Sequence, residues 1–128
     1  MNGFIISLPT SSNALYVGHG KNKRQSPKYK SWLTQAGMEI IQARSEKRFK
    51  RLDVGWYRTA MYWPAEDKAD ADNRIKAMHD LLRHMRCTPD DKWLWGSKQE
   101  RSWEIQPGTC FVKFWNVKDE ETRAPLGS

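Results

Sequence analysis

The sequence predicts a small α+β domain in which a mixed β-sheet packs against two main helices, in the approximate order β-α-β-α-β-β. Two long segments carry apolar residues at helical spacing, and four shorter segments are rich in β-branched and aromatic residues. The 128 residues, 38% of them hydrophobic and seven of them Trp, are enough for one core. We therefore expect a single domain over residues 1–117, followed by a mobile tail over residues 118–128.

The first part of the chain predicts one strand and one helix. Residues 4–8 are rich in residues that favour β-strands and end at Pro9, which predicts a strand, and a polar loop follows over residues 10–25. Ser26 and Pro27 are typical of a helix N-cap and first helical position, so we expect a helix over residues 27–47. Its apolar residues recur at helical spacing and predict one buried stripe: Tyr29, Trp32, Leu33, Ala36, Ile40 and Ala43.

The second part predicts three strands and one helix. Residues 52–63 are dominated by β-branched and aromatic side chains and stop at Pro64, which indicates a strand. A helix is expected over residues 70–86, before Thr88 and Pro89. Two further strands, over residues 101–105 and 110–115, are expected on either side of a turn that contains Pro107 and Gly108.

Charge favours a nucleic-acid partner. The formal net charge is +7, and residues 21–51 hold ten basic residues against two acidic ones. The basic residues at the end of the first helix are equally well explained as solvated charges that complement the helix dipole. The candidate DNA-binding residues are Lys21, Lys23, Arg24, Lys28, Lys30, Arg48, Lys50 and Arg51.

The chain carries no apolar run near the ~20 residues that a membrane-spanning helix needs. We therefore expect a soluble, cytoplasmic protein with no membrane partner. Cys87 and Cys110 are too few for a disulfide framework and are expected to be reduced thiols. The absence of a Gly-rich phosphate loop argues against a nucleotide cofactor.

Acidic residues gather near the second helix in this otherwise basic chain. Asp70 and Asp72 are two residues apart at its start, where Asp72 is also explained simply as an N-cap. Asp90 and Asp91 follow the helix and offer carboxylates from a separate segment. Mg²⁺ prefers oxygen ligands and takes few carboxylates, so these four residues are candidate metal ligands.

The second helix is predicted to have a polar face opposite its core face. At ~100° per residue, Ile75, Met78, Leu82 and Met85 share one face, and Asn73, Lys76 and Asp80 lie roughly opposite. Lys76 follows Asp72 by one turn and is a candidate to contact a phosphate during its displacement. An i,i+4 ion pair with Asp80 is the alternative role.

The spaced acidic pattern resembles that of the RusA family of Holliday-junction resolvases. The family pattern has an Asp-x-Asp-Asn at a helix start, a Lys three residues later, an Asp-x-Leu one turn further and a later Asp-Asp. It is matched by Asp70-Ala71-Asp72-Asn73, Lys76, Asp80-Leu81-Leu82 and Asp90-Asp91. The segment from Leu8-Pro9 through Ser12-Asn13 to Tyr16 is similar as well. The resemblance covers about residues 3–116.

The resemblance implies a homodimeric endonuclease that acts on four-way DNA junctions in recombination and repair, by paired symmetric nicks. Asp70, Asp72 and Asp91 would be the catalytic and metal-binding carboxylates, Asp90 would support them, and Lys76 would assist at the phosphate. Mg²⁺ is the expected cofactor and Mn²⁺ a substitute. Asp80 matches a family position, but we expect a structural role for it. Members are frequent in phages and prophages.

Two alternatives stay open at this point. A non-catalytic module that binds branched DNA would use its aspartates only as caps and solvated charges. A general flap or branched-DNA nuclease would use the same metal site. Seven Trp residues are more simply explained as core or dimer contacts, although Trp93 and Trp95, close to Asp91 in the chain, are candidates to pack against an unstacked base.

Overall fold

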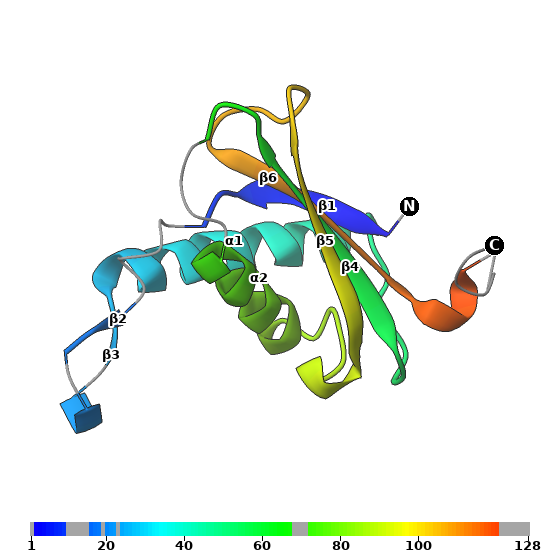
Figure 1. Ribbon diagram of the computed structural model, residues 1–128, viewed down its shortest axis with the longest axis horizontal. Coiled ribbons are helices and arrows are strands. Elements are labelled where there is room, and N and C mark those ends of the chain that lie inside the picture. The colour runs from blue at the N-terminus through cyan, green and yellow to red at the C-terminus, as the bar shows by residue number, and fades with distance from the viewer. Residues whose placement is uncertain (1, 10–15, 19, 23, 68–71, 121–128) are drawn as a thin grey trace.

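A four-stranded mixed sheet with two helices on one face forms the domain, as a computed structural model of the chain shows (Figure 1). The structure describes residues 2–9, 16–18, 20–22, 24–67 and 72–120. The strand order is β1-β6-β4-β5, from β1 (Gly3–Ser7), β6 (Thr109–Asn116), β4 (Tyr57–Pro64) and β5 (Leu94–Ser102). The predicted α+β class is confirmed.

Three of the four strands form antiparallel pairs, and one pair is parallel. β1 pairs with β6, and β6 pairs with β4, in antiparallel register. β4 and β5 are parallel, so the chain must cross back over one face of the sheet between them. That crossover contains helix α2 (Asp72–His84) and the short 3-10 helix η3 (Asp91–Trp93). Within this crossover, α2 contributes Ala77, Met78, Leu81 and Leu82 to the core.

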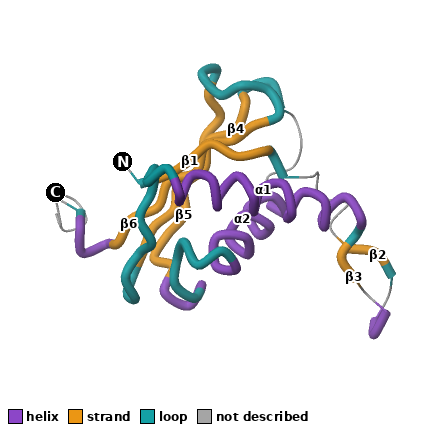
Figure 2. The backbone as a smooth tube through the Cα atoms, turned by 180° about the vertical axis from the view of Figure 1, so that it is seen from behind, coloured by secondary structure: helices purple, strands orange, loops and turns teal. Residues whose placement is uncertain are grey.

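Helix α1 (Pro27–Ser45) begins as the sequence predicts. The Ser26 hydroxyl accepts a hydrogen bond from the Tyr29 backbone N–H at 3.0 Å, and Pro27 occupies the first turn. The predicted apolar stripe is buried, apart from Leu33, which is partly exposed. Behind the two helices, β1, β4 and β6 contribute alternate side chains to the same core, which lies on one face of the sheet (Figure 2).

The predicted strand at 101–105 is wrong in position. The strand β5 begins at Leu94 and ends at Ser102, and residues 103–108 form the turn before β6. β5 lies at the edge of the sheet and most of its side chains are exposed, so its sequence lacks the alternating pattern on which the prediction relied. Local periodicity gives no signal for such an edge strand.

The predicted strand over residues 52–63 begins five residues too early. Residues 52–56 form an irregular segment that includes Gly55 at φ 141°, and β4 begins at Tyr57. The backbone N–H of Leu52 donates to the Cys87 carbonyl instead of to a strand. The apolar composition of this segment reflects packing against the core, since Leu52 contacts it.

The expected loop over residues 10–25 contains a small antiparallel ribbon. It is formed by β2 (Tyr16–Val17) and β3 (Arg24–Gln25), with the 3-10 helix η2 (Gly20–Asn22) between them. The ribbon projects beyond the first turn of α1, away from the sheet (Figure 1). It therefore places its basic residues far from the rest of the domain.

The described part of the chain continues past β6 to residue 120. A 3-10 helix, η4 (Val117–Asp119), follows β6, and Glu120 accepts hydrogen bonds from Arg58 and from the Trp115 indole. The rest of the expected tail lies outside the described residues. Among the described helices, none is long and apolar enough to cross a membrane.

Candidate functional site

One face of α2 carries a row of polar and charged side chains. At ~100° per residue, Lys76, His79, Asp80 and Arg83 fall on the same side as the backbone position of Asp72. The opposite side is buried, and Ala77, Met78, Leu81 and Leu82 belong to the core. We call the row formed by Lys76, His79, Asp80 and Arg83 the polar face of α2.

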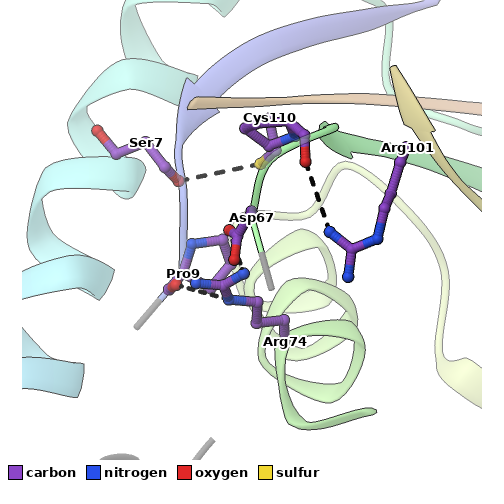
Figure 3. Close-up of polar contacts among 7 residues, drawn as sticks. Ser7, Pro9, Asp67, Arg74, Arg101 and Cys110 are labelled. Atoms are coloured by element: carbon purple, nitrogen blue, oxygen red, sulfur yellow. Dashed lines mark hydrogen bonds and ion pairs between the residues drawn. The ribbon is translucent and has the colours of Figure 1, made fainter. Parts of the chain in front are cut away.

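A buried arginine holds the first turn of α2 in place (Figure 3). The Arg74 Nε donates to the Pro9 carbonyl at 3.2 Å, and its Nη1 forms an ion pair with the Asp67 carboxylate. Arg74 is almost fully buried, so this pair is little screened by water. The contacts tie together the end of β1, the end of β4 and the start of α2. They thereby fix the turn in which Asp72 lies.

Asp91 lies at the other end of α2. Its Oδ1 is 3.8 Å from Nη1 of Arg83, whose Nη2 is 3.5 Å from Oδ1 of Asp80. The Asp91 side chain remains 63% exposed. Arg83 therefore draws two carboxylates, one from α2 and one from η3, to the same end of the polar face.

Asp90 supports the position of Asp91. It is the N-cap of η3, and its carboxylate accepts from the Lys92 backbone N–H at 3.2 Å. A side-chain hydrogen bond with Asp91, together with this backbone N–H, lowers the pKa of Asp90 below its usual value. A carboxylate cap of this kind fixes the turn that carries Asp91.

His79 connects the polar face to the sheet. Its Nε2 is 2.9 Å from the Thr59 hydroxyl, which in turn lies 2.8 Å from the Ser97 hydroxyl. Burial lowers the pKa of His79, and the charges of Asp80 and Asp91 oppose that shift. Burial also raises the pKa of the neighbouring Tyr57. The imidazole is thus held neutral beside two carboxylates at neutral pH.

The predicted carboxylates do not all fall within the described residues. Asp70 lies outside them, and so does the side chain of Asp72, although its backbone begins α2. Arg83, which contacts Asp91, follows Asp72 by eleven residues, or a rise of ~16 Å along the helix. Within the described part of the chain, Asp91 therefore lies toward the far end of α2 from Asp72.

The oxygen atoms of the predicted carboxylates are of the kind that Mg²⁺ prefers, but the described residues do not bring three such side chains to one point. Carboxylate oxygens are the ligands that Mg²⁺ prefers, and the Asp91 oxygens are open to solvent. Among the residues that the structure describes, no three His, Cys, Asp or Glu side chains come together as a metal site. The carboxylate oxygens thus have the donor chemistry that Mg²⁺ prefers, and those of Asp91 are accessible to solvent.

The candidate DNA-binding residues divide between two regions at opposite ends of α1. Lys21 and Arg24 lie on the projecting ribbon, with Lys28 and Lys30 in the adjoining first turn of α1, and all four are exposed. Lys23 lies outside the described residues. The nineteen residues of α1 separate this region from the other by ~28 Å.

The second region is a basic pocket of about 650 Å³ beside the C-terminal end of α1. It is lined by five basic residues, two carboxylates and several other side chains, with Trp115 as one of its walls. The basic residues are Arg44, Lys47, Arg48, Lys50 and Arg51. Arg48 is paired with Glu46 and Arg44 donates to the Met85 carbonyl, so much of the net positive charge of the pocket comes from the other three.

Sequence reasoning missed Arg74, Asp67, His79 and Arg83 as organising residues. Arg74 lies on the core side of α2, where a charged residue within an apolar stripe is a signal for a buried partner. Arg83 lies on the same face as Lys76 and Asp80, which the helical spacing already exposes. No local signal connects His79 to Thr59, because that contact depends on how α2 crosses the sheet.

Comparison with protein-family models and with curated proteins finds no match for this chain. Its function is therefore argued from the site and from the sequence pattern alone.

Proposed function

We propose that this protein is a Mg²⁺-dependent endonuclease that resolves four-way DNA junctions in recombination and repair. The observation that carries the proposal is the polar face of α2, where Lys76 lies one turn beyond Asp72 and Arg83 contacts the exposed Asp91. Carboxylates on the surface of a protein of net charge +7 repel DNA unless a cation lies between them. A metal-dependent reaction on a phosphodiester accounts both for the surface carboxylates and for the net positive charge of the protein.

The residues have separate roles in this proposal. Asp91 would hold Mg²⁺, with Asp70 and Asp72 completing the site within one protomer or across the homodimer, and the bound ion would supply the Lewis acid that activates water and stabilises the leaving oxygen. Asp90 fixes the turn that carries Asp91. The Lys76 ammonium offers a positive charge to the phosphate that is cleaved. Mn²⁺ is expected to replace Mg²⁺, since both accept oxygen ligands in octahedral geometry.

The two basic regions are far enough apart to contact separate phosphates of one DNA substrate. They lie ~28 Å apart along α1, close to the ~34 Å of one turn of duplex DNA. The ribbon region would contact the phosphates of one arm and the basic pocket those of another. We also propose that the protein works as a homodimer in the cytoplasm, since symmetric nicks in two strands need two sites.

The test is cleavage of a synthetic mobile four-way junction, with nicks mapped on both strands. We expect paired symmetric nicks with Mg²⁺ or Mn²⁺ and no cleavage in EDTA. Asp91→Asn removes a ligand charge without changing size and should reduce the cleavage rate by at least about 10²-fold, a typical loss for a group that stabilises a transition state. Asp70→Asn should do the same, while binding survives or tightens.

Glu104→Gln is the matched control, because Glu104 is an exposed carboxylate in the turn after β5, outside both the basic pocket and the polar face of α2. It should cleave at the wild-type rate. Wild-type cleavage by Asp91→Asn or Asp70→Asn would contradict the metal-site assignment. Equal cleavage of linear duplex and four-way junction at the same salt concentration would contradict the resolvase assignment and favour a general nuclease.

The rival proposal is a non-catalytic protein that binds branched DNA. Its supporting observation is that Arg83 already accompanies Asp80 and Asp91, as expected for carboxylates with a structural role. This rival predicts tight junction binding and no Mg²⁺-dependent nicks from the wild-type protein. The cleavage assay with and without Mg²⁺ separates the two proposals.

A further inference from the structure

Three tryptophans form an exposed cluster where β4 and β5 begin. The Trp56 ring lies 5.3 Å from that of Trp93 and 5.4 Å from that of Trp95, centroid to centroid, with interplanar angles of 73° and 74°. Trp56 is 47% exposed and Trp95 is 54% exposed. Keeping this much indole surface in water is unfavourable, so a cluster of this size indicates a contact with a ligand. We call these three residues the tryptophan cluster.

Cations and a hollow adjoin the tryptophan cluster. The Lys92 ammonium lies 5.9 Å from the Trp93 ring centroid, and the Arg58 guanidinium lies 5.9 Å from that of Trp95. A hollow of about 650 Å³ on the outer face of the sheet is lined by Arg58, Lys98 and Gly96, among others. A Cβ atom on Gly96 would lie 3.1 Å from Nη1 of Arg58, so the glycine leaves room for the guanidinium.

The hollow continues toward the basic pocket. Trp115 lines both of them, because it lies near the end of β6 that pairs with the start of β4. Beside the hollow, Arg58 is paired with Glu120 at 2.6 Å and Lys98 with Glu100 at 3.1 Å, and the Lys113 ammonium lies 5.6 Å from the Trp115 ring centroid. A chain of phosphates bound in the basic pocket therefore has a path along Trp115, with Lys113 beside it, that leads toward the tryptophan cluster.

We propose that the tryptophan cluster and the adjoining hollow bind an unpaired nucleotide of a DNA strand, with its base stacked on Trp95 and its phosphate near Arg58 and Lys98. This rests on the proposed function, since an unpaired base is what the centre of a branched junction offers. Stacking on an aromatic side chain contributes ~1–3 kcal/mol per base and tolerates any base. Asp91 lies two residues before Trp93, so the unpaired nucleotide is held beside the proposed cleavage site.

A second copy of the chain is the less suitable occupant. A symmetric contact places the same patch against itself, so the exposed Lys92 ammonium, which lies beside Trp93, would be brought toward its copy. Repulsion between like charges disfavours that arrangement, whereas a phosphate between them is favoured. A nucleic-acid strand satisfies both the rings and the cations.

The experiment measures binding of a fluorescein-labelled oligothymidine to the full chain by anisotropy, in EDTA and at fixed salt. Trp95→Ala is expected to weaken binding about tenfold, and Trp95→Phe to restore most of the affinity, because stacking needs a ring rather than an indole. Trp103→Ala is the matched control. Trp103 is 81% exposed but follows the opposite end of β5, so its loss should leave the affinity unchanged.

The proposal is overturned if Trp95→Ala binds oligothymidine as tightly as the wild type, or if Trp103→Ala loses as much affinity. It is also overturned if Trp95→Ala changes the oligomeric state in sedimentation while the affinity stays constant, because the cluster is then a contact between copies. Since no metal is present, failure of the nuclease proposal appears separately, as wild-type protein that binds oligothymidine but never nicks a junction.

Discussion

The two ends of α2 are held in opposite ways. At its start, Arg74 is buried and paired with Asp67, and it also donates to the Pro9 carbonyl. At its end, Arg83 is half exposed and lies 3.5 Å from Asp80 and 3.8 Å from Asp91. The Arg74–Asp67 pair is rigid because removing either partner leaves a buried charge. The pairs of Arg83 with Asp80 and Asp91 are weaker because water and salt screen them.

This difference separates a structural arginine from one that adjusts a site. The Arg74 contacts fix the position of the first turn, where Asp72 lies, against two strands. The Arg83 contacts keep Asp91 near the polar face while leaving its carboxylate accessible to a cation. If a carboxylate such as Asp91 is to bind a metal ion reversibly, the arginine paired with it must be easy for the ion to displace.

The largest expected difference between the two ends is in stability. Arg74→Met should lower the free energy of unfolding by about 3 kcal/mol, because it leaves the Asp67 carboxylate buried without its ion-pair partner. Arg83→Met should change it by less than about 1 kcal/mol, as is usual for exposed pairs. Urea denaturation of both variants measures the difference. Equal losses would show that the two ends do not differ in the way described.

A smaller effect is expected on metal dependence. Arg83→Met removes a positive charge beside Asp91, so the Mg²⁺ concentration for half-maximal junction cleavage should fall by about two- to fivefold, given that charges 4 Å apart in water interact by about 1 kcal/mol. Arg101→Met, at an exposed arginine near the far end of β5, is the control and should leave it unchanged. A rise in the Mg²⁺ requirement of Arg83→Met would indicate that Arg83 positions Asp91 rather than competing with the ion.

The smallest expected effect is the pH dependence that His79 adds to the end of α2. Burial lowers its pKa in the folded state, so the unfolded chain binds more protons as the pH falls below about 6.5. The contribution of His79 to the free energy of unfolding is therefore present above pH 6.5 and is lost as the pH decreases through the pKa that His79 has in the folded state. His79→Gln should lose a few degrees less in Tm between pH 7.5 and pH 5 than the wild type.

His84→Gln provides the control for that measurement, because His84 lies on the same helix and is exposed. Its Tm should follow the wild-type pH dependence. If His79→Gln also follows the wild type, then burial does not hold the pKa of His79 below its usual value.

Much of the fold could be predicted because its signals are local. The Ser26-Pro27 helix start, the buried stripe of α1 and the core face of α2 follow from spacing alone, and the structure confirms them. The position of β5 could not be predicted, because an exposed edge strand shows no alternation. The ribbon formed by β2 and β3 was missed because two-residue strands carry no pattern.

The candidate site was only partly predictable, because residue type and spacing give only local signals. Residue types and helical spacing identify Lys76 and Asp80 as neighbours on one face of α2. They do not reveal that Asp91 lies near the end of α2 rather than its start, or that Trp56 meets Trp93 and Trp95. Those contacts join segments that are far apart in the chain.

The sequence by itself determined the α+β class, the two helices, the basic charge and the pattern of aspartates, because each depends on residue type and short-range spacing. Only the tertiary structure decided which strand lies at the edge, how the basic residues divide between two regions, and which end of α2 receives Asp91. These depend on the parallel pairing of β4 with β5, which forces α2 to cross the sheet. A crossover brings together residues whose separation along the chain carries no local signal.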